Sequence, residues 1–172
     1  MNPPGARNRV RLAASHDRDA WLDLRRLLWP EEAAQNAHET ADYFVSGRIA
    51  DIPHAVFVAD DTEPPIALSG FLECSLRDDR IRGGRPLRAH VEGWFVLRSH
   101  RRRGVGRALL NAAAEWARAQ GCAQLTSDTV ARYAAESIPA HVACGFRVVT
   151  SSTDAEAADH LASGGFWLER TL

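Results

Sequence analysis

Arginines and glycines gather in one short stretch whose chemistry suits an anion. Residues 98–107 contain no acidic residue and hold Arg98, Arg101, Arg102, Arg103, Gly104, Gly106 and Arg107. An apolar, strand-like run precedes this stretch and an amphipathic helical pattern follows it. Unpaired N–H groups at a helix start and guanidinium groups both attract anions. The stretch is neither a P-loop, because no Gly-Lys pair follows, nor a Rossmann turn, because the Gly-x-Gly-x-x-Gly spacing is absent.

Charge is distributed unevenly along the chain. Residues 29–79 hold eleven acidic residues against Arg48 and Arg77 alone. One cationic spot and one acidic region predict an anionic ligand beside a cationic one. The alternative is that these two charged regions are simply solvated surface. All 21 cationic residues are arginine, which excludes lysine Schiff-base chemistry. A net charge of −1 and a single arginine cluster argue against a nucleic-acid binder.

Length and composition predict one globular domain over residues 1–172, with 1–8 as a flexible N-terminal tail. No stretch approaches a membrane span and the N-terminus lacks the apolar core of a secretory signal. Three widely spaced cysteines argue against a disulfide framework or a Cys-x-x-Cys metal site. We therefore expect a cytoplasmic protein without membrane attachment or a bound metal.

Hydrophobic periodicity predicts the elements that position these residues. Strands are expected over 9–13, 55–59, 66–77, 89–97, 124–128, 147–151 and 166–172, and helices over 16–28, 39–46, 105–120 and 135–143. Ser15 or Asp17 is a plausible cap for the first helix, which Trp29-Pro30 ends. An antiparallel hairpin followed by alternating strands and helices indicates an α+β, or mixed α/β, fold with helices flanking a central, mostly antiparallel sheet.

The order of motifs resembles the GNAT superfamily of acyl-CoA-dependent N-acetyltransferases. The segment Arg101-x-x-Gly104-x-Gly106-x-Ala108 is similar to the diphosphate-binding turn of that family. Further fragments resemble one branch, the aminoglycoside 6′-N-acetyltransferases: Leu28-Trp29-Pro30, Gly70-Phe71-Leu72-Glu73, Glu92-Gly93-Trp94-Phe95-Val96, Glu115-Trp116-Ala117, Ser127-Asp128-Thr129 and Ser137-x-x-x-His141-x-x-x-Gly145-Phe146. The resemblance covers nearly the whole chain and implies the GNAT fold.

The resemblance implies that acetyl-CoA is the acetyl donor. The strand edge at Phe95 and Val96 would pair with the pantetheine arm, and N–H groups near Val96 would stabilise the oxyanion. The residues implied at the diphosphate are Arg101, Arg102, Arg103, Gly104, Val105, Gly106, Arg107 and Ala108. A surface turn with solvated arginines is the alternative.

The acceptor implied is the 6′-amine of an aminoglycoside, which attacks the thioester directly. Such an amine is mostly ammonium at neutral pH, so a carboxylate must hold it and accept its proton. Glu92 and Asp128 match the substrate-contacting acids of the family. The alternatives are a salt bridge across the sheet for Glu92 and a helix cap or turn for Asp128. Trp29, with acids near it, is expected to contact the cationic sugar.

Two residues, His141 and Arg80, leave the acceptor and its chemistry open. His141 stands where many GNAT enzymes have tyrosine, so it could protonate the thiolate, bond to the pantetheine arm, or be a core or capping histidine. Arg80 stands where branch members carry tyrosine against the sugar, an odd choice for a cationic substrate. A GNAT enzyme acting on a polyamine, a small amine or a protein N-terminus is the alternative function. The resemblance and the apolar C-terminal run also predict a homodimer.

Overall fold

The computed structural model describes residues 9–61, 67–78 and 87–172 of the chain. The helices are α1 (Arg18–Leu28), α2 (Ala33–Ser46), α3 (Val105–Ala119), α4 (Ala131–Val142) and α5 (Ala155–Ala162), with 3-10 turns at Ser15–Asp17, Pro30–Glu32 and Arg98–His100. The strands are β1 (Val10–Leu12), β2 (Arg48–Ile49), β3 (Ile52–Asp60), β4 (Leu68–Arg77), β5 (Arg88–Val96), β6 (Gln124–Thr129), β7 (Arg147–Val149) and β8 (Phe166–Thr171). The expected tail over 1–8, the first residue of the strand expected over 66–77, and Arg80 lie outside the described residues.

The strands follow the order β1-β3-β4-β5-β6-β8-β7, and β2 pairs with β3 off this path. Among the strand pairs with a defined register, β5 with β6 is parallel and the others are antiparallel. The expected α+β fold with a mostly antiparallel sheet is confirmed. The chain divides into two compact units whose boundaries fall inside β4, β5 and α3. The first unit holds residues 1–74 and 93–113, and the second holds 75–92 and 114–172.

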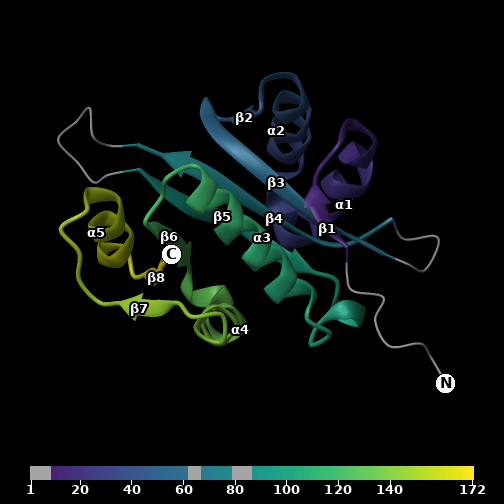
Figure 1. Cartoon of the computed structure of the whole chain (residues 1–172). Helices are drawn as coiled ribbons and strands as arrows, with labels where there is room; N and C mark the ends of the chain where they lie inside the picture. Colours follow the sequence, from purple (N-terminus) through teal and green to yellow (C-terminus); the bar gives the residue numbers. More distant parts are fainter. Residues whose placement is uncertain (1–8, 62–66, 79–86) are drawn as a thin grey trace. The chain divides into compact units, whose positions relative to one another are not determined.

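Helices α1 and α2 pack side by side in the first unit (Figure 1). Helix α1 buries Trp21, Leu24 and Arg25, which share one helical face. The buried side chains of this core are Trp21, Leu24, Ile49, Val56, Val58, Leu68 and Phe71. Helix α1 ends before Pro30 as expected, and Gly47 ends α2 in a left-handed conformation with φ of 69°. Asp17, one of the two expected caps, occupies the cap position of α1, but its side chain does not cap the helix and instead accepts a hydrogen bond from the Ala14 N–H.

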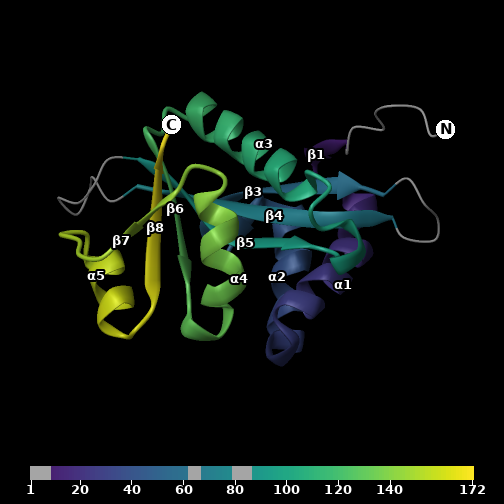
Figure 2. The ribbon, with the colours of Figure 1, turned by 90° about the horizontal axis from the view of Figure 1, so that it is seen from below.

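Strand β8 lies between β6 and β7 in the second unit, antiparallel to both. The parallel pairing of β5 with β6 covers Ala89–Val91 and Leu125–Ser127. Helix α4 packs beside β6 and β8, and α5 packs beside β8 (Figure 2). The sequence patterns did not predict α5. Its N-terminus is capped by Asp154, whose side chain accepts a hydrogen bond from the Ala157 N–H.

No helix in the described part of the chain is both long and apolar enough to cross a membrane.

Candidate functional site

The arginine-glycine stretch in the first unit forms a turn that opens α3. Arg102 and Gly104 both have positive φ, 64° and 85°. Left-handed residues of this kind bend successive N–H groups toward one side of a turn. The first helical bond runs from the Ala108 N–H to the Gly104 oxygen, so the N–H groups of residues 105–107 have no acceptor within the helix. The turn and the helix start therefore present backbone donors that suit an anion.

The same turn is tied to the end of β5. The Nε of Arg101 donates to the Val96 carbonyl over 3.1 Å, and the Leu97 N–H donates to the Ser69 oxygen over 2.9 Å. A Cβ on Gly106 would lie 3.0 Å from the Trp94 ring, so glycine lets α3 approach the strand closely. Phe95 is half-buried and its ring packs against Phe71. The residues expected to hold the donor thus form one connected structure within the first unit.

Trp29 lies at the end of α1, against the backbone of β5. A Cβ on Gly93 would lie 2.5 Å from the Trp29 ring, so only glycine leaves room for the indole there. The Arg25 guanidinium lies 5.1 Å from the ring centre, which places a cation of the protein itself over this aromatic group. Arg25 also forms an ion pair with Glu39. Of the nearby acids, Glu31 and Glu32 remain exposed.

Glu92 belongs to the second unit and forms a salt bridge there. Its Oε1 pairs with Arg77 and accepts a hydrogen bond of 2.5 Å from the Ser75 hydroxyl. Burial opposes ionisation of Glu92, but the charges of His90 and Arg77 and these hydrogen bonds outweigh it, so its pKa is lowered. The salt bridge considered as the alternative for Glu92 is therefore present. The side chain keeps 25% of its surface exposed.

Asp128 lies within β6, between two imidazoles. Its Oδ1 is 3.0 Å from Nε2 of His90, and its Oδ2 is 3.5 Å from Nε2 of His160. Burial opposes ionisation, but the hydrogen bond from His90 and the electrostatic interactions with His90, His160 and Arg77 lower the pKa of Asp128 overall. Asp128 is a strand residue here, and Val130 occupies the cap position of α4. The alternative of a capping aspartate is not what the structure shows.

A pocket of about 510 Å³ opens beside Asp128 in the second unit. Its lining, which we name the α5 pocket, consists of Arg77, His90, Asp128, Glu156, Asp159, His160, Ser163 and Trp167. This set contains three carboxylates and one guanidinium group. With its histidines neutral, the lining therefore has a net negative charge. An anionic pocket with a tryptophan in its wall suits a cationic, ring-shaped ligand.

His141 is buried in α4, with 4% of its surface exposed. Its Nδ1 lies 2.8 Å from the Ser137 carbonyl and its Nε2 lies 3.0 Å from the Ser127 hydroxyl. A carbonyl only accepts, so Nδ1 carries the proton and Nε2 accepts from Ser127. Burial lowers the pKa of the imidazole despite the Ser137 hydrogen bond and the Asp128 charge. These contacts favour the core-histidine interpretation over the two catalytic ones.

Sequence reasoning missed several polar residues of the second unit. His90 is 1% exposed, and Arg88 is equally buried and pairs with Glu156. A signal was present, because Arg88, His90 and Glu92 alternate along a strand and so share one face. A buried strand with three ionisable residues on one face indicates a polar site. Three residues were expected to contact the acceptor. The two acids, Glu92 and Asp128, lie in the second unit, whereas Trp29 lies in the first.

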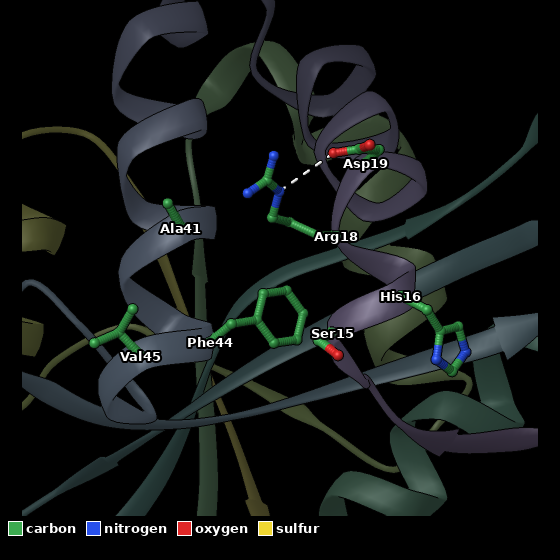
Figure 3. A pocket seen from close by; sticks show the side chains of 7 residues that line it. All are labelled: Ser15, His16, Arg18, Asp19, Ala41, Phe44 and Val45. Atoms are coloured by element: carbon green, nitrogen blue, oxygen red, sulfur yellow. Dashed lines mark hydrogen bonds and ion pairs between the residues drawn. The ribbon is translucent and has the colours of Figure 1, made fainter.

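A second pocket, of about 460 Å³, lies in the first unit between α1 and α2. Figure 3 shows that Arg18 and Asp19 in its wall pair with each other, with Nε and Oδ1 3.2 Å apart. The charges of this pocket are therefore balanced, whereas carboxylates outnumber guanidinium groups in the lining of the α5 pocket. In the residues that the structure describes, no group of three or more histidine, cysteine, aspartate or glutamate side chains could hold a metal ion.

Comparison with known proteins identifies the family. Residues 21–146 match the model of the acetyltransferase (GNAT) family. An aminoglycoside N(6′)-acetyltransferase type 1 of Klebsiella aerogenes is 39% identical over 142 residues, which cover 81% of this chain and 90% of the relative. The solved structure of AAC(6′)-Iy with the bisubstrate analogue CoA-S-monomethyl-acetylneamine is similar with a TM-score of 0.69 and 28% identity, covering 84% of this chain and 93% of that one. AAC(6′)-Iy with CoA gives a TM-score of 0.67 and 29% identity, covering 86% and 92%. The chain belongs to the GNAT family of acetyltransferases, in the branch of the aminoglycoside N(6′)-acetyltransferases.

Proposed function

We propose that this enzyme transfers the acetyl group of acetyl-CoA to the 6′-amine of an aminoglycoside by direct attack of the amine on the thioester. The observation that carries the acceptor side is the α5 pocket, in which Asp128 and two further carboxylates meet one arginine. The chain's relatives supply the reaction, since the related Klebsiella aerogenes protein is an aminoglycoside N(6′)-acetyltransferase. The anionic pocket fits a polycationic acceptor of that kind.

The donor half of the proposal uses the turn and helix start of the first unit. Backbone N–H groups from Arg102 to Arg107 would hold the diphosphate of coenzyme A within the segment Arg101 to Ala108, with the exposed arginines adding charge. Left-handed backbone at Arg102 and Gly104 supports this assignment, because such a bend gathers N–H groups around an anion. Phe95 and Val96 at the end of β5 would lie along the pantetheine arm. An N–H group near Val96 would stabilise the oxyanion that forms as the thioester is attacked.

The acceptor half uses the two carboxylates of the second unit. Asp128 and Glu92 have lowered pKa values and so remain anionic at neutral pH, which suits them to bind an ammonium group. The same property makes them weak proton acceptors. We assign to Trp29 the role of an aromatic wall for the sugar, supported by its anchoring against Gly93. His141 is assigned to hold β6 in place through Ser127, in keeping with its buried contacts.

The assembly and location of the enzyme complete the proposal. We propose a homodimer, on the ground of the resemblance and the apolar C-terminal run. We propose the cytoplasm as its location, supported by three cysteines that remain free thiols. The reaction as proposed needs no metal ion, because the amine is a sufficient nucleophile once it loses a proton.

An assay of free thiol release tests the function. Purified enzyme is mixed with acetyl-CoA and, in separate reactions, with kanamycin, spermine and a peptide with a free N-terminus. The proposal predicts release of coenzyme A thiol with kanamycin. Turnover of spermine or the peptide without turnover of kanamycin would favour the alternative acceptor instead.

A further inference from the structure

Three imidazoles interact with Asp128, those of His90, His141 and His160, and they differ in whether a ring nitrogen is open. Both nitrogens of His141 are engaged, by Ser137 and Ser127. Both nitrogens of His90 are also engaged, with Nδ1 2.8 Å from the Thr126 hydroxyl and Nε2 3.0 Å from Asp128. Each of these two rings is nearly fully buried. Neither can take a proton from a ligand without breaking a contact.

His160 is different, because its contacts leave one nitrogen open. Its Nε2 lies 3.2 Å from the Thr129 carbonyl and 3.5 Å from Oδ2 of Asp128. Both neighbours are hydrogen-bond acceptors, so Nε2 carries the proton of the neutral ring. Nδ1 then bears the lone pair, and in the described part of the chain it has no hydrogen-bond partner. The side chain is 18% exposed and lines the α5 pocket.

The surroundings hold the imidazole in this position. A Cβ on Gly165 would lie 2.1 Å from Nε2 of His160, so glycine leaves space that the ring occupies. The Trp167 ring is 6.2 Å away, centre to centre. An imidazole whose Nε2–H is held by a backbone carbonyl beside a carboxylate, in a side chain that lines a pocket, can act as a general base through its other nitrogen.

We propose that Nδ1 of His160 takes the proton of the acceptor ammonium, while the Thr129 carbonyl holds the ring in the required tautomer and the nearby Asp128 carboxylate stabilises the imidazolium. This inference rests on the proposed acetyl transfer to an amine. The ammonium loses one proton to Nδ1 and becomes a neutral amine. The amine nitrogen then bonds to the thioester carbon, the carbon–sulfur bond breaks, and the second nitrogen proton leaves with the thiolate as the free thiol. The proton on His160 passes to solvent.

The charges around His160 favour this role. Asp128 on β6 and Glu156 and Asp159 on α5 are negative. Arg77 on β4 is positive and pairs with Glu156 and Glu92, and Arg88 on β5 also pairs with Glu156. His90 on β5 is the remaining titratable group of the pocket. The carboxylates stabilise an imidazolium once it forms. Asp128 and Glu92, whose pKa values are lowered, are poor proton acceptors by comparison.

The test is the dependence of kcat/KM for kanamycin on pH, from about pH 6 to about pH 9, in wild type and His160→Gln. Glutamine keeps a polar side chain but cannot accept the proton. We expect a loss of about 100-fold at the acidic end that shrinks as the pH approaches the pKa of the acceptor amine, because the amine then deprotonates unaided. Affinity for acetyl-CoA, measured by calorimetry, should stay within about twofold of wild type.

Two further variants make the result decisive. Gly165→Ala leaves His160 in the sequence but pushes its ring away, and it should reproduce the pH-dependent loss even where His160→Gln folds poorly. His16→Gln is the matched control, because His16 is 73% exposed and lies 3.4 Å from Asp17 in the first unit. It should behave as wild type.

Equal losses at every pH, or activity within about twofold of wild type in both pocket variants, would overturn the role of His160. Absence of kanamycin turnover in the wild-type enzyme would instead overturn the proposed function.

Discussion

Nε2 of His90 lies 3.0 Å from Oδ1 of Asp128, and the imidazole is 1% exposed. A carboxylate accepts hydrogen bonds only, so the imidazole is the donor. The buried ring thereby fixes the orientation of a carboxylate that is itself 34% exposed to the α5 pocket. Asp128 is thus a preorganised anion on a strand.

Asp128→Asn should impair the acceptor side alone. The amide keeps the shape of the side chain but removes the charge that binds an ammonium group. We expect kcat/KM for kanamycin to fall by about 100-fold, with acetyl-CoA affinity nearly unchanged. Steady-state kinetics and calorimetry measure the two quantities. Asp23→Asn, at an exposed position of α1, is the control; weakened coenzyme binding in Asp128→Asn would move this residue out of the acceptor site.

Glu92→Gln should reduce turnover and also stability. In the described residues Arg77 pairs with two carboxylates, Glu92 and Glu156, so the variant removes one of these two ion pairs. Loss of one charged hydrogen-bond partner costs about 1–3 kcal/mol in unfolding free energy. Urea unfolding would reveal this cost, and an unchanged midpoint together with full activity would show that the salt bridge matters for neither property.

Acid should destabilise the protein through these carboxylates. The pKa values of Glu92 and Asp128 are lower in the folded protein than in the unfolded chain, so folding favours their deprotonated forms. Their stabilising contribution is complete above the unfolded pKa, near about pH 4, and is lost as the pH falls through the folded values. Melting temperatures recorded from neutral to acidic pH should fall more steeply for wild type than for the Glu92→Gln, Asp128→Asn double variant. Parallel curves would show that these groups do not carry the acid sensitivity.

Gly104→Ala should weaken acetyl-CoA binding by disturbing the backbone. Gly104 has φ of 85° and nothing within 4 Å of an added Cβ, so the substitution acts through conformation and not through a clash. Left-handed alanine costs about 1–2 kcal/mol. Gly121 has φ of 82° and equally open space, and Gly121→Ala is therefore a control with the same backbone cost. Calorimetry should show about tenfold weaker coenzyme binding in Gly104→Ala alone; equal affinities in the two variants would contradict the assigned turn.

Local patterns predicted most elements, because apolar periodicity and turn residues act within a few residues. Trp29-Pro30 ended α1 as expected, and the strand before the arginine cluster was found at 88–96. Helix α5 was missed because its apolar residues are mostly alanine, which gives a weak amphipathic pattern. Asp154 is of a residue type that favours the N-cap position, so it was a signal for the start of α5. The start of α2, at Ala33, was also placed six residues too late.

The acceptor site was only partly predictable. Asp128 and Glu92 were found through a motif, but their partners come from other strands and from α5. His160 lies 32 residues after Asp128, and only the pairing of β6 with β8 and the packing of α5 bring them together. Contacts of this kind depend on tertiary structure, so no local pattern reports them. The same holds for the Arg77–Glu156 ion pair.

The central claim is acetyl transfer to the 6′-amine, and a matched pair of acceptors tests it most directly. Neomycin and paromomycin share the same scaffold, but paromomycin carries a hydroxyl where neomycin carries the 6′-amine. The enzyme with acetyl-CoA should acetylate neomycin, with the new amide at the 6′-nitrogen by mass spectrometry and NMR, and should leave paromomycin unmodified. Equal acetylation of both acceptors, or of neither, would contradict the account.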